Sequence, residues 1–132
     1  MPTLKQLNAI SCSISLAASA TTDGLEATIQ VVNARGDALA GVRKLEVWIS
    51  EDAEGEGLTA DSYSGAVTAT VGTILTALTA KKHFECLTSA DGIVKLLAVA
   101  SANPADQYIC VNRPDGEGVI VSVASGTNWE GA

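Results

Sequence analysis

The chain has 132 residues, 47% of them apolar and only 4% aromatic, with 8 basic residues, 15 acidic residues and a net charge of −7. This length is typical of one domain that can bury a core without disulfides. The acidic balance argues against a nucleic-acid surface, which needs clustered cations. No run approaches the ~18 apolar residues of a membrane span, so we expect neither nucleic acid nor a membrane as a partner.

Three cysteines, Cys12, Cys86 and Cys110, are too sparse and odd in number to form a disulfide scaffold. We interpret them as small buried hydrophobic residues of a protein made in a reducing cytosol. Residues 18–20, Ala-Ser-Ala, and 9–12, Ala-Ile-Ser-Cys, resemble export-cleavage sites. However, a single lysine supplies the positive charge before them, and serines interrupt the apolar stretch. An ordinary first strand is therefore favoured over an export signal.

Apolar and polar residues alternate along much of the chain, which predicts half-buried strands, and helical periodicity is scarce. In segment 10–19, apolar residues alternate with serines. The Asp23-Gly24 turn leads into a second strand, 25–33, so the two segments predict a hairpin. A third strand, 44–50, would place Trp48 on its outward face. The expected inward residues of the second and third strands are Leu25, Ala27, Ile29, Val31, Leu45, Val47 and Ile49.

Segment 51–65 contains five acids and three glycines, which predicts a long surface loop that repulsion between the acids can make mobile. Gly72 separates two short segments, 67–71 and 73–79. Both are rich in β-branched residues, although Ala and Leu in the second also permit a turn of helix. The other expected strands are 83–89, 93–100, 107–113 and 119–124. Segment 93–100 is a nearly continuous apolar run, which suits a strand covered on both faces or packed on a neighbouring subunit.

These segments amount to about seven to nine short strands with regularly spaced turn signals, which predicts an all-β sandwich. We expect one domain, residues 10–124. An N-terminal arm, residues 1–9, would precede it, and a C-terminal tail, residues 125–132, would follow it.

Two motifs point to a family. Residues 33–42 follow the pattern N-x-x-G-x-x-L-x-G-V between two alternating strands, and residues 88–92 follow T-x-A-D-G before another strand. Tyr108, two residues before Cys110, is similar to the tyrosine corner of Ig sandwiches. Together these motifs resemble the invasin-type Ig-like domains of bacteria and phages. The resemblance implies an Ig-like β-sandwich of antiparallel strands, here without an inter-sheet disulfide.

A narrower set of motifs lies in order within residues 42–99: V-W-I-S at 47–50, G-T-I-L at 72–75, T-A-K-K-H at 79–83 and the turn at 88–92. This order resembles small Ig-like virion proteins of tailed phages. The resemblance implies a non-enzymatic virion structural protein, above all a head-decoration or cement protein on the outer capsid surface. The alternatives are an Ig-like component of the phage tail or fibre, or a bacterial surface Ig-like binding module.

The same resemblance implies the partners and the location. The partners would be other virion proteins, namely the major capsid or tail protein, and further copies of the chain. The protein would be made in the bacterial host cytoplasm and would reside in the virion.

Candidate chemistry is sparse in the sequence. His83 is the single histidine, and no Cys-x-x-Cys or Gly-x-Ser-x-Gly spacing accompanies it, so we interpret it as a strand-end polar residue. Five acids offer oxygen ligands to calcium but lack the EF-hand order, which favours a solvated loop. They are Glu51, Asp52, Glu54, Glu56 and Asp61. We expect no catalytic residue, no cofactor and no metal.

Trp48 and Trp129 are the candidate partner-binding residues. Trp48 either packs under a loop or meets a partner, and Trp129 either anchors a neighbour or folds back with the tail onto its own domain. Residues 35–37, Arg-Gly-Asp, have the sequence of an adhesion signal. The strand connection around them explains Gly36 as a turn residue, so we expect no receptor for this triplet.

Overall fold

A computed structural model describes residues 9–60, 63–101, 106–126 and 128–130. The strands are β1 (Ile10–Ala18), β2 (Gly24–Asn33), β3 (Lys44–Ser50), β4 (Thr68–Val71), β5 (Thr73–Thr79), β6 (His83–Leu87), β7 (Ile93–Val99), β8 (Tyr108–Asn112) and β9 (Val119–Val121). The expected all-β class is therefore confirmed. Residues 1–8 of the expected arm lie outside the described residues. Within the described part of the chain, no helix is long and apolar enough to cross a membrane.

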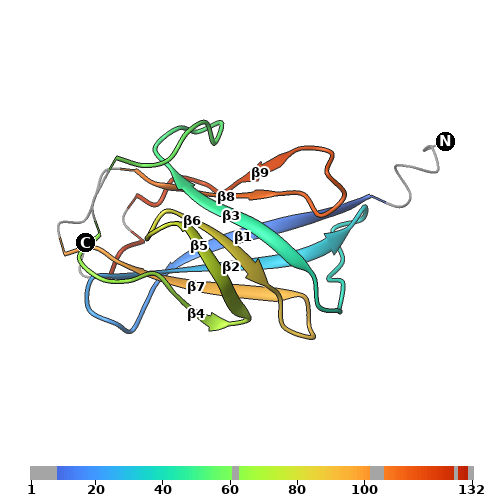
Figure 1. Ribbon diagram of the computed structural model, residues 1–132, viewed down its shortest axis with the longest axis horizontal. Coiled ribbons are helices and arrows are strands. Elements are labelled where there is room, and N and C mark those ends of the chain that lie inside the picture. The colour runs from blue at the N-terminus through green and yellow to red at the C-terminus, as the bar shows by residue number, and fades with distance from the viewer. Residues whose placement is uncertain (1–8, 61–62, 102–105, 127, 131–132) are drawn as a thin grey trace.

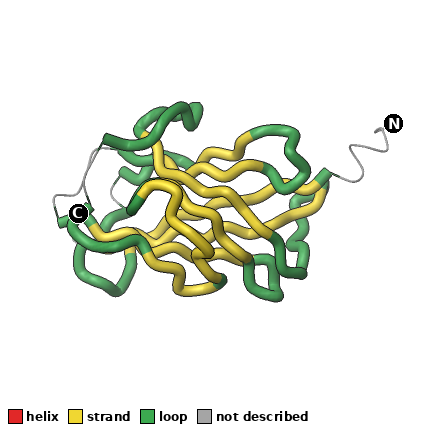
Figure 2. Tube along the Cα trace, viewed as in Figure 1, coloured by secondary structure: helices red, strands yellow, loops and turns green. Residues whose placement is uncertain are grey.

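The strands form two antiparallel sheets that lie face to face (Figure 1, Figure 2). One sheet has the order β1-β2-β7-β4 and the other β5-β6-β3-β8-β9. In strand order, the first sheet corresponds to A-B-E-D of an immunoglobulin sandwich, and β3-β8-β9 corresponds to C-F-G. The hairpin β5-β6 extends the second sheet beside β3, where variable-type domains place two further strands. Here, however, the hairpin comes from the chain between β4 and β7.

The core lies between the sheets and is built mainly from aliphatic residues. All seven inward residues expected in β2 and β3 are buried, so the predicted faces of these strands are confirmed. Segment 73–79 is a strand and not a turn of helix. Strand β7 is central in its sheet, and its residues alternate between buried and half-buried, so the run 93–100 is covered more fully on one face than on the other.

All three cysteines are free and buried, as the sequence predicts. Burial raises the pKa of Cys12 and Cys86 to about 11 and that of Cys110 to about 12. Cys12 and Cys86 belong to the core cluster between the sheets, whereas Cys110 is buried at a different place, described below.

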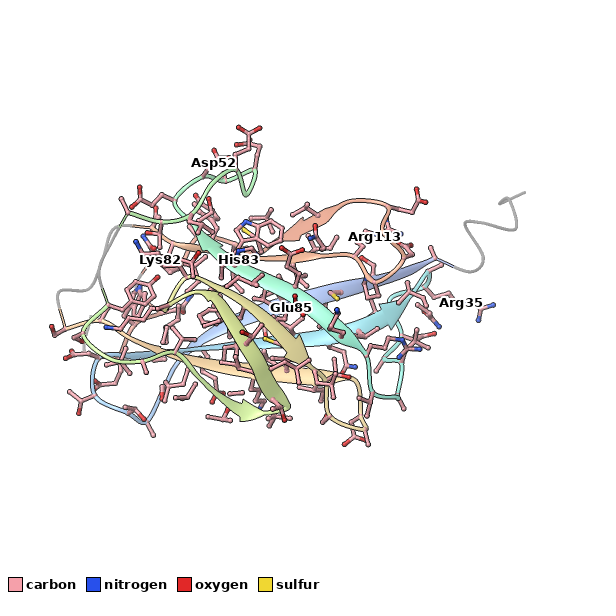
Figure 3. All side chains as sticks on the ribbon, in the orientation of Figure 1. Arg35, Asp52, Lys82, His83, Glu85 and Arg113 are labelled. Atoms are coloured by element: carbon pink, nitrogen blue, oxygen red, sulfur yellow. The ribbon has the colours of Figure 1, made fainter. Side chains whose placement is uncertain are left out.

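The loop after β2 confirms the strand connection expected for residues 33–42. The Asn33 side-chain oxygen accepts hydrogen bonds from the backbone N–H groups of Arg35 (2.9 Å) and Asp37 (3.0 Å). Gly36 has φ +85°, which favours glycine. Arg35 projects from the end of the molecule (Figure 3), and the triplet forms an exposed turn whose geometry Asn33 supports.

Candidate binding surfaces of the five-stranded sheet

The outer face of the five-stranded sheet is partly covered by the loop that follows β3. Trp48 points outward from β3, as expected, and its indole Nε1–H donates to the carbonyl oxygen of Gly55 at 2.9 Å. Gly55 lies so close to β8 and β9 that a Cβ atom there would be 3.1 Å from Cys110 Sγ and 3.1 Å from a methyl carbon of Val121. The loop thus packs on Trp48 and explains why Cys110 is buried outside the core.

Carboxylates hold this loop together through hydrogen bonds to its own backbone. The Asp52 carboxylate accepts from the backbone N–H of Glu56 at 3.0 Å. Glu51 accepts from the Thr59 hydroxyl and from the backbone N–H of Ala60, both at 3.1 Å. Among the described residues, no group of three or more His, Cys, Asp or Glu side chains is placed to hold a metal ion. Asp61, the fifth acid predicted for this loop, lies outside the described residues.

Beside the loop, Glu46 is held by two side chains from neighbouring strands. Its Oε2 lies 2.6 Å from His83 Nε2, and its Oε1 accepts a hydrogen bond of 2.7 Å from Asn112 Nδ2. An ionised carboxylate only accepts hydrogen bonds, so His83 Nε2 carries the hydrogen in this pair. Strands β6, β3 and β8 are adjacent in the sheet and present these three side chains on one face. His83 also meets Trp48 edge to face, with ring centroids 6.3 Å apart.

These residues line an open hollow of about 340 Å³. Its lining consists of Glu46, Trp48, Gly55, Gly57, Leu58, His83 and Asn112. The Glu46 side chain remains 41% exposed although it accepts two hydrogen bonds, and Leu58 is 40% exposed. The hollow therefore combines an oriented anionic acceptor with an aromatic ring and an aliphatic side chain. Trp48 both packs under a loop and lines this hollow, so the two roles considered for it are compatible.

A second candidate surface is the edge strand β5. Its pairing with β6 shifts register twice, between Ile74 and Thr76 and between Ala77 and Thr79. The extra residues at these two β-bulges are Leu75 and Leu78, and each is 50% exposed. Bulges commonly redirect a side chain on an edge strand. The two bulges of β5 leave both leucine side chains exposed to solvent on one short strand.

The edge formed by β5 also carries no charge. From Ser62 to Ala80 the sequence contains no acidic or basic residue, in a chain whose net charge is −7. At the opposite edge of the same sheet, Val119 is 44% exposed and Val123, just beyond β9, is 69% exposed. Both edges of the five-stranded sheet thus present aliphatic side chains to solvent.

Trp129 is buried in the core, whereas a residue that anchors a partner would be exposed. It is 1% exposed, belongs to the core cluster and meets Tyr63 edge to face at 5.7 Å. The Glu130 carboxylate accepts from the backbone N–H of Asp23 at 2.7 Å, which ties the tail to the β1–β2 turn. The described part of the tail, residues 125–126 and 128–130, therefore folds onto its own domain, and the buried Trp129 indole is not accessible to a partner.

Sequence reasoning singled out His83 and Trp48 but not the residues that complete the hollow. The outward position of Glu46 follows from the alternation in β3, so this residue was open to prediction. Asn112 and Leu58 reach the hollow only through strand pairing and loop folding. The exposure of Leu75 and Leu78 was also not predicted, because the bulges that expose them depend on the pairing of β5 with β6.

Comparison of this chain with protein-family models, with curated proteins and with solved structures found no match.

Proposed function

We propose that this chain is a non-enzymatic virion structural protein of a tailed phage, and that it decorates the outer surface of the capsid. The family resemblance of the ordered motifs motivates this role. The observation that supports it most strongly is the edge strand β5, where the side chains of Leu75 and Leu78 are exposed to solvent on an uncharged segment. Apolar side chains of this kind serve as anchors when a partner surface buries them.

The bulged geometry of β5 favours attachment through its side chains over pairing through its backbone. Edge strands with regular geometry invite backbone pairing with other chains, and bulges oppose it. The two shifts in β5 therefore favour insertion of the leucines into apolar depressions of a capsid protein over extension of the sheet. Many copies attached to one capsid lattice gain strength by avidity, so each single contact can be weak.

Mass spectrometry of purified virions from a phage that carries this gene tests the role. The protein should be found in intact particles, and electron microscopy should place it on the head. A position on the tail or fibre would replace decoration with the tail alternative. Absence from the particles, together with presence on the bacterial surface, would overturn the phage role and favour the surface binding module.

A binding assay then tests the edge itself. Particles that lack the protein are mixed with the purified chain, and the bound amount is measured after sedimentation. The double variant Leu75→Asp/Leu78→Asp should lose at least about tenfold in affinity, because two apolar anchors are replaced by charges. Ser13→Asp/Ser15→Asp is the matched control, since it adds the same charges at exposed positions of edge strand β1 in the other sheet. Equal losses in both variants would exclude a specific role for β5.

A further inference from the structure

The hollow beside Glu46 has a chemistry that the proposed attachment through β5 does not use. We propose that it binds the guanidinium group of an arginine side chain carried by a partner protein. The inference is independent of the phage role and can be tested on the isolated chain.

Glu46 supplies the oriented acceptor. His83 and Asn112 hold its two oxygens at 2.6 Å and 2.7 Å, which fixes the plane of the carboxylate. A carboxylate has about four acceptor positions, so two donors leave room for further hydrogen bonds. Its side chain is 41% exposed, so a ligand can reach it. A planar guanidinium matches a carboxylate of fixed orientation better than a point-like ammonium does.

The remaining lining suits the rest of an arginine side chain. Trp48 lines the hollow, and guanidinium groups interact favourably with aromatic rings. Leu58, 40% exposed at the same hollow, offers an apolar surface for the aliphatic stem. The volume of about 340 Å³ is roughly ten times that of one water molecule, which accommodates such a side chain.

The negative charges around the hollow favour a cationic ligand over an anionic one. From Leu45 to Ala80 the sequence holds six acids and no lysine or arginine. Two of the nearby cations already have partners: Lys44 Nζ lies 3.4 Å from Glu85, and Lys81 Nζ donates to the Tyr63 carbonyl oxygen at 2.7 Å. Lys82, which directly precedes His83 in the sequence, is a further cation, and the six acids outnumber it. An anionic ligand would therefore meet repulsion here, whereas a basic residue of a partner would be attracted.

The binding test uses the peptide acetyl-Gly-Arg-Gly-amide, titrated at low ionic strength into ¹⁵N-labelled protein. The indole Nε1–H of Trp48 and the side-chain amide of Asn112 report on the hollow by NMR. Their signals should shift and saturate together. The same peptide with citrulline, which keeps the shape and loses the charge, should bind at least about tenfold more weakly, and the lysine peptide should lie between the two.

Two variants and one control complete the test. Glu46→Gln removes the charge, and Leu58→Lys places an ammonium at an exposed position of the lining. Each should weaken arginine binding about tenfold or more while the spectrum stays that of a folded protein. Asp91→Asn makes the same charge change as Glu46→Gln in an exposed turn and should leave binding unchanged. Equal binding of the citrulline peptide, or undiminished binding by both variants, would overturn the proposal.

Discussion

Gly92 lies against the carbonyl oxygen of Leu39 so closely that a Cβ atom at position 92 would overlap it. The backbone N–H of Val31 donates to the Gly92 carbonyl oxygen, and the N–H of Leu39 donates to the Val31 carbonyl oxygen, both at 2.9 Å. In the same region, the backbone N–H of Gly41 donates to the carbonyl oxygen of Ala90 at 2.7 Å. The two sequence motifs in residues 33–42 and 88–92 are therefore parts of one packed unit at one end of the sandwich (Figure 1).

Gly92→Ala should destabilise the protein by about 3 kcal/mol or more, because it combines an unfavourable φ of +76° with an overlap on rigid backbone. Gly116→Ala is the matched control. Gly116 has φ +75° but no atom within 4 Å of an added Cβ, so only the backbone strain of about 1 kcal/mol is expected. Urea unfolding followed by circular dichroism measures both. Equal losses would show that position 92 tolerates a Cβ and that the Leu39 contact is looser than described.

Trp129→Ala should lower the free energy of unfolding by about 3–5 kcal/mol, because the indole is 1% exposed and packs on Tyr63 within the core. Trp129→Phe, which keeps most of the apolar contact, should cost less and guards against complete unfolding of the alanine variant. Val123→Ala, at a residue 69% exposed, should change stability by no more than about 0.5 kcal/mol. A Trp129→Ala variant as stable as Val123→Ala would mean that the tail is not part of the core.

Asp115 links the start of β1 to the β8–β9 turn and should make stability depend on pH. Burial alone raises its pKa, but hydrogen bonds from the backbone N–H of Glu117, from Arg113 and from the backbone N–H of Ile10 bring the pKa below its ordinary value. The native carboxyl thus binds a proton less readily than the unfolded one. Its contribution to stability is complete above the unfolded pKa of ~3.9 and is lost as pH falls through the lower native pKa.

Asp115→Asn should therefore be less stable than the parent at pH 7, and the difference should shrink as pH falls below about 4. Unfolding in urea at several pH values measures this convergence. Asp91→Asn, in another Asp-Gly turn, serves as the control for the substitution itself. A stability difference between Asp115→Asn and the parent that stays constant from pH 7 to pH 3 would contradict the role assigned to these hydrogen bonds.

Much of the fold was open to prediction because its signals are local. Alternation placed β2 and β3 within one residue of their observed ends and assigned their inward faces correctly. The pattern around Asn33 predicted the strand connection, since its hydrogen bonds span only a few residues. The sequence did not predict which side chains β5 exposes, because the two bulges beside Leu75 and Leu78 arise from its pairing with β6.

The sequence by itself determined where the strands lie and which faces β2 and β3 bury, because the periodicity of a strand is a property of neighbouring residues. Only the tertiary structure decided how the strands pair, where Trp129 goes and that a hollow forms beside Glu46. The Glu46–Asn112 hydrogen bond joins residues 66 positions apart, and Trp129 meets Tyr63 across a similar separation. Such contacts depend on the register of β3, β6 and β8 and on the folding of the loop over Cys110. No local pattern specifies either.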